Sequence, residues 1–262
     1  MNILEQIIAD KYKEVASKKE RISVNDYEQM PMFAGDRKSL KQSLLAQGST
    51  GIIAEYKRKS PSKGIINANA DVASVTKAYA QSAAGISVLT DESYFGGTNE
   101  DIIRARETVN TPLLRKDFMV DEYQLYEARA IGADVILLIA AALSKQQTKH
   151  LAQKAKELQL EVLLEVHNEE ELDHVCDGVT MVGVNNRNLK TFEVNINTSL
   201  DLIRKLPTEM PAVAESGISE ISSIVTLRSA GFKGFLIGEN FMKHANPSVA
   251  FTQFVNELKG TS

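Results

Sequence analysis

Glu55 and Lys57 lie two residues apart at the end of a short apolar run, within IAEYKRKSPSKG at 53–64. Residues two apart in a strand share a face, so this carboxylate and ammonium point to the same side. The inside of a parallel barrel is usually filled by Val, Ile and Leu. Because two charges are costly to desolvate there, a fold that keeps them is expected to use them for chemistry. The alternative is a surface strand with one exposed ion pair.

Other polar residues also stand where apolar runs end. These are Lys116, Glu165, Asn185, Arg187, Glu215 and Ser216. By alternation, Lys116 and Glu165 replace apolar residues on an inward face. Taken singly, Lys116 could pair with an outer carboxylate, and Glu165 could cap the next helix. Two lysines and two glutamates at one barrel mouth supply acids and bases whose protonation a partly dry site can tune.

Glycines follow the last two apolar runs. Gly217 comes after the seventh run, and Gly238 and Glu239 come at the end of the eighth. Barrels commonly bind a phosphate on backbone N–H groups at this place. A phosphate-bearing substrate is therefore expected, although such glycines also occur in ordinary turns. The Glu239 carboxylate must face away if its N–H contacts the phosphate.

The elements that must position these residues alternate between strands and helices. The expected strands are 51–56, 85–89, 112–116, 134–139, 161–166, 180–185, 211–215 and 233–238. The expected helices are 72–84, 122–131, 145–158, 169–175, 199–205, 219–230 and 247–259. Gly85, Gly132 and Gly231 are expected to end helices, and Asn246 followed by Pro247 to begin one. We expect an α/β fold, a (β/α)8 TIM barrel as one domain over 1–262, with a doubly wound open sheet as runner-up.

The first 47 residues precede the first expected strand and form an N-terminal helical extension. Ile3, Leu4, Ile7, Ile8 and Val15 recur at helical spacing there. This helix could plug the barrel floor or reach over the active-site mouth, and the spacing does not choose between them.

Composition narrows the function. A formal net charge of -4 disfavours a nucleic-acid binder. Cys176 is the only cysteine, which excludes an internal disulfide and a zinc site built on several thiolates. The longest apolar run, 135–143, is too short to cross a membrane, and the amino terminus is unlike a secretory signal, so a cytoplasmic location is expected. The four histidines show no metal-binding spacing, and no metal is predicted.

Seven stretches occur in barrel order and carry a resemblance. They are IAEYKRKSPSKG, SVLTDESYFGG, PLLRKDFMVDEYQ, LLEVHNEEEL, VGVNNRNL, VAESGI and FLIGENFM. Together they closely resemble the indole-3-glycerol phosphate synthase family, and the match covers essentially the whole chain. The resemblance implies ring closure of 1-(2-carboxyphenylamino)-1-deoxy-D-ribulose 5-phosphate to indole-3-glycerol phosphate, with loss of carbon dioxide and water, in tryptophan biosynthesis. It implies no cofactor.

The resemblance also implies roles for individual residues. Lys116 looks like the general acid at the substrate carbonyl oxygen, and Glu165 is similar to the general base. Lys57 would hold the substrate carboxylate and serve as an acid in dehydration. Glu55 would orient the lysines, and Asn185 would hold the reacting hydroxyls.

Substrate-binding residues follow from the same motifs. The resemblance implies that Arg187, Glu215 and Ser216 position the substrate, with Ser216 also counted among the catalytic groups. The phosphate would lie near Ser60, Gly217, Gly238 and the backbone at Glu239. Phe95, Phe118 and Leu189 would form an apolar wall for the anthranilate ring. Asn186 and Glu239 depart slightly from the family pattern.

Two rival functions remain at this stage. Phosphoribosylanthranilate isomerase, on a related barrel, would need a cysteine base near the end of strand one, where this chain has Glu55. A non-catalytic phosphate-binding barrel predicts that Lys116→Ala and Glu165→Gln alter binding without abolishing turnover. The expected partner is a small phosphorylated substrate, with no nucleic acid and no membrane. We expect a monomer, with other tryptophan-pathway enzymes as candidate partners.

Overall fold

The computed structural model describes residues 2–188 and 191–261, and its eight main strands form a closed parallel barrel in the order β1-β10-β9-β8-β7-β6-β5-β4. These strands are β1 (Ile52–Tyr56), β4 (Gly85–Leu89), β5 (Leu113–Lys116), β6 (Val135–Ile139), β7 (Glu161–Val166), β8 (Met181–Asn185), β9 (Ala212–Glu215) and β10 (Gly234–Ile237). Each lies inside its predicted range. The predicted (β/α)8 barrel is confirmed, and the closed sheet contradicts the doubly wound alternative.

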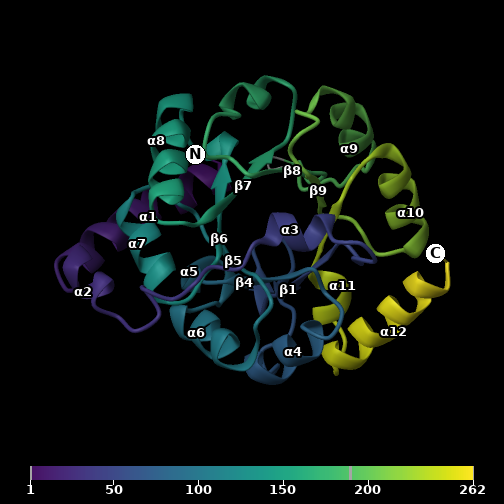
Figure 1. The fold of residues 1–262 in the computed structure, drawn as a ribbon, viewed down its shortest axis with the longest axis horizontal. Helices are drawn as coiled ribbons and strands as arrows, with labels where there is room; N and C mark the ends of the chain where they lie inside the picture. The colour runs from purple at the N-terminus through teal and green to yellow at the C-terminus, as the bar shows by residue number, and fades with distance from the viewer. Residues whose placement is uncertain (1, 189–190, 262) are drawn as a thin grey trace.

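Helices surround the barrel (Figure 1). The α-helices are α1 (Ile3–Lys19), α2 (Val24–Glu28), α3 (Leu40–Leu45), α4 (Val72–Tyr79), α5 (Glu92–Phe95), α6 (Asn99–Thr108), α7 (Tyr123–Ala130), α8 (Lys145–Glu157), α9 (Asn197–Leu202), α10 (Ile221–Ala230), α11 (Glu239–Met242) and α12 (Pro247–Gly260). Short 3-10 helices are η1 (Ala140–Ala142), η2 (Glu170–His174) and η3 (Ile203–Lys205). A small hairpin joins β2 (Lys59–Ser60) to β3 (Gly64–Ile65). Segment 169–175 is therefore a 3-10 helix rather than an α-helix, and α6 was not predicted.

The barrel interior follows the two-residue alternation of the strands. Ile53, Leu114 and Leu163 belong to one buried inner cluster. Two residues further along β1, β5 and β7 come Glu55, Lys116 and Glu165. The inward face therefore changes from apolar to charged at the carboxyl ends of the strands, which is where barrel enzymes place their working groups.

The floor of the barrel is closed by α3, whose Leu40 and Leu44 join the inner cluster. Gly85 is the first residue of β4, and a Cβ atom there would overlap the Leu40 side chain. The prediction that Gly85 ends a helix is wrong, because α4 ends at Tyr79 and Gly85 instead makes room for α3. Gly231 does end α10, with a φ of 121°.

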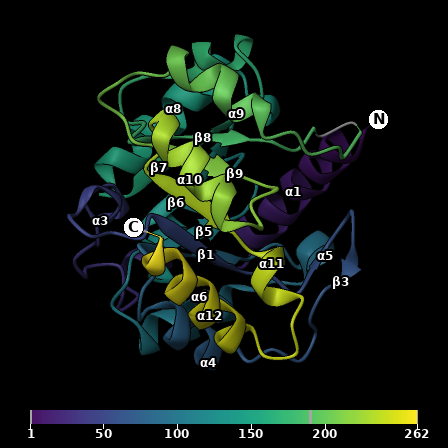
Figure 2. The same cartoon turned by 90° about the vertical axis from the view of Figure 1, so that its right-hand side faces the viewer.

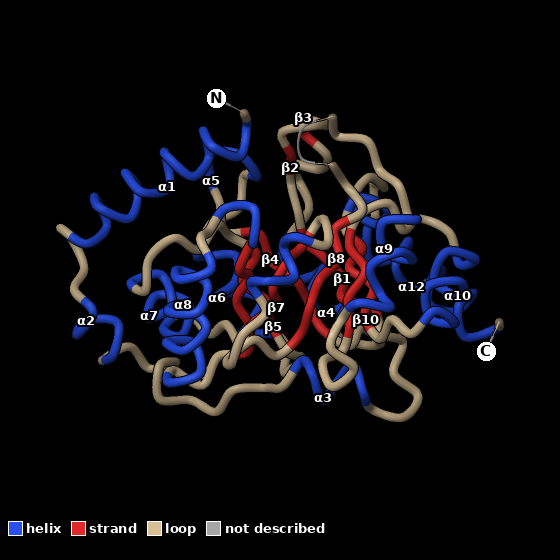
Figure 3. Tube along the Cα trace, turned by 90° about the horizontal axis from the view of Figure 1, so that it is seen from above, coloured by secondary structure: helices blue, strands red, loops and turns tan. Residues whose placement is uncertain are grey.

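The N-terminal helix α1 lies at the opposite end, over the mouth. Figures 2 and 3 show α3 at one end of the barrel and α1 with the β2–β3 hairpin at the other. Ile3, Leu4 and Ile7 of α1 line the pocket formed at that end. The mouth-covering alternative is therefore correct for α1, while a different part of the extension covers the floor.

A ring of alternating charges fastens α1 to the barrel. Each member lies within 3.2 Å of the next, in the order Lys11, Asp117, Arg115, Glu127, Lys18 and Glu14, and back to Lys11. Lys11 is only 2% exposed and also contacts Asp91 at 2.9 Å. Because Asp117 directly follows Lys116, this ring connects α1 to the end of the strand that carries a central site residue.

None of the helices in the described ranges combines the length and apolar character that a membrane span requires.

Candidate active site

A pocket of about 320 Å³ opens at the carboxyl ends of the strands. Every predicted site residue within the described ranges lines it. These residues are Glu55, Lys57, Ser60, Phe95, Lys116, Phe118, Glu165, Asn185, Arg187, Glu215, Ser216, Gly217, Gly238 and Glu239. Leu189 lies outside the described residues. Strand ends predicted most of these positions, and the family resemblance predicted Ser60, Phe95 and Phe118.

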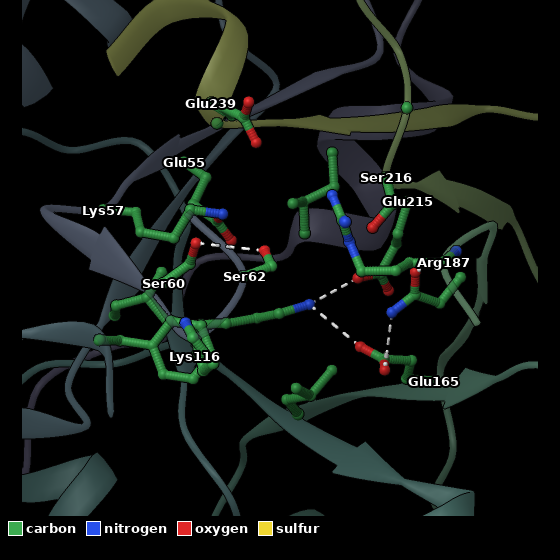
Figure 4. Close-up of a pocket in the computed structure, with 18 of the residues that line it drawn as sticks. Glu55, Lys57, Ser60, Ser62, Lys116, Glu165, Arg187, Glu215, Ser216 and Glu239 are labelled. Carbon is green, nitrogen blue, oxygen red and sulfur yellow. Dashed lines mark hydrogen bonds and ion pairs between the residues drawn. The ribbon is translucent and has the colours of Figure 1, made fainter. Parts of the chain in front are cut away.

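Lys116 lies at the centre of the polar part of the pocket (Figure 4). Its Nζ is 2.5 Å from Oε2 of Glu215 and 3.2 Å from Oε2 of Glu165. Burial alone would lower the pKa of Lys116, but the charges of Glu215 and Glu165 raise it well above its ordinary value. The side chain is therefore an ammonium at neutral pH, able to donate a proton.

Glu165 is held as a carboxylate. Burial acts to raise its pKa, but Lys116 and then His167 bring the pKa far below the usual range of a glutamate. Asn185 donates from Nδ2 to Oε1 of Glu165 at 3.0 Å, which fixes the orientation of the carboxylate. The group is thus ionised and oriented, as a general base must be.

Glu215 binds a proton more readily than Glu165 does. Burial raises its pKa to about 7, with Lys116 opposing the shift and the nearby Glu165 adding to it. Its Oε1 is buried and has no hydrogen-bond partner among the described residues. A Cβ atom on Gly183, in the neighbouring strand β8, would overlap this oxygen. Glu215 therefore has one oxygen free for a substrate hydroxyl.

Glu55 and Lys57 form the ion pair expected from their spacing. Lys57 Nζ is 2.9 Å from Oε1 of Glu55, which is only 4% exposed and therefore not part of a surface strand. Ser87 donates to the other carboxylate oxygen at 3.3 Å. The carboxylate fits because residue 238 is a glycine. A Cβ atom at that position would lie only 2.6 Å from Oε1 of Glu55.

The apolar side of the pocket contains two aromatic rings. Phe95 comes from α5 and Phe118 follows β5, and their ring centroids are 6.0 Å apart. Ile3 and Leu4 of α1 extend this surface. The pocket therefore places an apolar wall beside the charged cluster, which suits an aromatic ring bearing polar groups.

Another part of the pocket is built from backbone turns. Ser216 adopts a left-handed φ of 65° and Gly217 a φ of 75° directly after β9. Such backbone strain in a residue other than glycine is characteristic of functional sites. The Glu239 carboxylate lies 3.7 Å from Lys63 Nζ in the loop between β2 and β3. Gly217, Gly238 and the backbone of Glu239 line this side together.

Comparison with known proteins identifies the family. The family model described as "Indole-3-glycerol phosphate synthase" matches residues 4–254. The chain belongs to the indole-3-glycerol phosphate synthase family. Curated proteins of that name from Bacteroides thetaiotaomicron and Chromobacterium violaceum are 45% and 44% identical, covering 98% and 96% of this chain and 99% and 97% of theirs. A chain from a Pyrococcus furiosus tryptophan synthase complex has a TM-score of 0.60 at 17% identity, covering 81% of this chain and 98% of its own, and shows the fold alone.

In this member of the indole-3-glycerol phosphate synthase family, Phe192 and Lys243 are among the pocket residues that the sequence reasoning missed. Phe192 lies in the loop after β8, has a left-handed φ of 60°, and accepts a hydrogen bond at its carbonyl oxygen from Nη1 of Arg187 at 3.2 Å. Lys243, directly after α11, adds a cation to the pocket lining. Neither residue stands at a strand end, so strand alternation could not find them. The four residues of α11 are too few to show a helical period.

Proposed function

We propose that this chain converts 1-(2-carboxyphenylamino)-1-deoxy-D-ribulose 5-phosphate to indole-3-glycerol phosphate, with release of carbon dioxide and water, as a carboxy-lyase of tryptophan biosynthesis. The observation that carries the proposal is the Lys116 ammonium, held between Glu165 and Glu215 beside a pair of aromatic rings. This arrangement joins a proton donor, a proton acceptor and an apolar wall in one pocket. The family membership supports the same reaction.

The ring closure uses Lys116 as general acid. Its ammonium donates a proton to the substrate carbonyl oxygen while the aromatic ring carbon that carries the carboxylate attacks the carbonyl carbon. A carbon–carbon bond forms, and the carbonyl becomes a hydroxyl. Loss of carbon dioxide then leaves its bonding electrons in the ring. Because the pocket is partly dry, the positive charge of Lys116 acts more strongly there than it would in water.

Dehydration completes the reaction. Lys57 donates a proton to the departing hydroxyl, and Glu165 accepts the proton that is lost from the substrate. Glu55, 2.9 Å from Lys57, orients its ammonium. Asn185 fixes Glu165 and lies within reach of the substrate hydroxyls. Ser216, Arg187 and Glu215 position the substrate in this proposal.

The phosphate binds opposite the aromatic wall. Backbone N–H groups at Gly217, Gly238 and Glu239 would surround it, with Ser60 nearby. Ser60 Oγ lies 3.5 Å from Ser62 Oγ, so two hydroxyls meet at this side of the pocket. The phosphate would draw Lys63 from Glu239, whose carboxylate otherwise faces that lysine at 3.7 Å.

The decisive experiment follows product fluorescence. The chain contains no tryptophan, so the indole emission of the product rises against a tyrosine and phenylalanine background. Wild-type protein mixed with the substrate should produce this rise. Lys116→Ala should lower kcat by about 10²- to 10⁴-fold, the usual contribution of general acid–base catalysis.

The matched control is Lys149→Ala on the exposed face of α8, which should keep wild-type turnover. A folded wild type that gives no emission contradicts the proposed function. Full turnover by Lys116→Ala contradicts the role of Lys116. A monomer in the cytoplasm, with other tryptophan-pathway enzymes as candidate partners, remains the expectation from the sequence.

A further inference from the structure

His167 contacts the Glu165 carboxylate from outside the set of residues that line the pocket. It follows β7 directly and is two residues beyond Glu165. Its Nε2 lies 3.3 Å from Oε1 of Glu165, and its Nδ1 lies 3.1 Å from Oε2 of Glu171 in η2. The imidazole, 11% exposed at its side chain, therefore stands between two carboxylates.

The second carboxylate is itself fixed in place. Glu171 Oε2 accepts the backbone N–H of His167 at 2.8 Å, and its Oε1 accepts Nδ2 of Asn168 at 2.9 Å. Glu165 accepts hydrogen bonds from Lys116 and Asn185 on its two oxygens. Because both carboxylates are occupied as acceptors, each is best satisfied in its ionised form.

Neither neutral form of His167 fits this position. A neutral ring has one N–H and one nitrogen lone pair, so either tautomer would leave an unprotonated nitrogen within 3.3 Å of an anionic oxygen. Only the imidazolium presents N–H groups to both carboxylates. In the described structure Nε2 makes no hydrogen bond of good geometry, so its contact with Glu165 is mainly an ion pair.

Building on the proposed role of Glu165 as general base, we propose that His167 is a positioning residue whose imidazolium holds the Glu165 carboxylate ionised and oriented for proton abstraction. The cation lies 3.3 Å from Glu165 and so favours its charged form. His167 does not touch the substrate in this role. It acts through Glu165, while Glu171 keeps the ring in its charged state.

The electrostatic surroundings support this assignment. Burial acts to lower the pKa of His167, but the interactions with Glu165 and Glu171 raise it to about 10. These two carboxylates, from β7 and η2, are the charged groups that face the ring within the described ranges. Lys116 and Glu215 act on Glu165 from β5 and β9. His167 therefore stays protonated across the neutral range.

The first test is the pH profile of kcat/KM for His167→Gln. Its acidic limb is the part of the profile in which kcat/KM falls as the pH is lowered and the general base becomes protonated. Glutamine keeps an N–H donor but loses the cation, so the pKa of Glu165 should rise and the acidic limb should move to higher pH by about one unit. His167→Lys, which returns a cation, should move the limb back toward the wild-type position. An acidic limb that stays in place in folded His167→Gln overturns the inference.

His174→Asn is the matched control. His174 belongs to the same η2 helix, and its ring contacts the carbonyl oxygens of Glu171 and Leu143 instead of a carboxylate. This variant should weaken the packing of η2 and leave the acidic limb unchanged. An equal shift in His174→Asn would show that disturbance of η2, rather than loss of the His167 cation, moves the limb, and would overturn the inference.

The second test does not depend on activity. The ring nitrogens of the four histidines are followed by ¹⁵N NMR in the wild-type chain, with His167 assigned by its absence in His167→Gln or, if that variant does not fold, in His167→Lys. Both nitrogens of His167 should remain protonated at pH 8. A neutral His167 ring at that pH overturns the inference. If the ring is protonated but the protein does not turn over the substrate, the proposed function is rejected and the charged state of His167 still stands.

Discussion

Two carboxylates of the pocket lie close to glycines that belong to the neighbouring strand or directly follow it. Glu215 in β9 occupies space beside Gly183 in β8, and Glu55 in β1 occupies space beside Gly238 at the end of β10. A side chain at either glycine would overlap the carboxylate. The positions of the reactive groups therefore depend on missing Cβ atoms as well as on their own hydrogen bonds. Interiors this closely packed tolerate little displacement.

Gly183→Ala tests this dependence at the residue scale. The new methyl group would push Glu215 away from Lys116, and a shift of about 1 Å in a catalytic group costs on the order of 10²-fold in rate. We expect kcat/KM to fall by about 10- to 100-fold in steady-state fluorescence assays. Gly260→Ala, where nothing lies within 4 Å of the added Cβ, is the control and should match wild type. Equal activity of the two variants would contradict the packing argument.

The sequence predicts the pocket residues well when they stand at strand ends. The two-residue period places Lys116, Glu165 and Glu215 on one face before any tertiary contact is known. The side chains that form ion pairs with these pocket residues are harder to predict from the sequence. His167 is visible in the sequence as a neighbour of Glu165, but its charge depends on Glu171, which the turn of η2 brings back against the ring. Lys243 and Phe192 lie outside strands, where no period applies.

At the scale of elements, α1 shows why the extension could not be assigned from its spacing alone. Its apolar residues would suit either end of the barrel. Lys11 determines at which end α1 lies, because it forms ion pairs with Asp91 after β4 and Asp117 after β5. Those partners lie far away in the sequence. The helix α6 was missed for a related reason, because only Ile102 and Ala105 are buried apolar residues in it, although Thr98 and Asp101 form a capping box.

Lys11→Met tests the attachment of α1. Removing this cation leaves the buried carboxylates of Asp91 and Asp117 without their common partner, and breaking a buried pair costs about 3–5 kcal/mol. The free energy of unfolding, measured by urea denaturation, should fall by an amount in that range.

Lys13→Met on the same helix is the control for this prediction. Lys13 is 76% exposed at its side chain, and its ion pair with Asp10 lies at the surface. Its replacement should change the free energy of unfolding by less than about 0.5 kcal/mol. Similar losses in the two variants would show that Lys11 is no more important than a surface lysine.

For the molecule as a whole, the total charge does not show where individual cations lie. The chain has a formal net charge of -4, and the pocket lining contains both signs. Its cations are Lys57, Lys116, Arg187 and Lys243, and its carboxylates are Glu55, Asp117, Glu165, Glu215 and Glu239. A substrate with phosphate and carboxylate groups would be attracted locally by the individual cations of the lining. Composition gives the sign of the total, but only the closed barrel shows that the cations gather at one end.

The proposed attraction should depend on ionic strength. Raising KCl from about 0.02 M to about 0.5 M shortens the screening length from roughly 20 Å to about 4 Å, so kcat/KM should fall several-fold, mainly through KM. Lys243→Gln should show a smaller dependence on salt than wild type. Lys259→Gln, at the end of α12, is the control and should keep the wild-type dependence. A salt-independent KM would contradict electrostatic attraction at the mouth.

The charged ring between α1 and the barrel also constrains how this chain can diverge. Its three cations and three carboxylates alternate, so losing one member leaves two groups of like charge as neighbours. Single replacements should be rare in descendants that keep α1 in place. We expect Lys11 to change together with Asp117 or Glu14, so that evolutionary substitutions at the mouth are inherited as pairs.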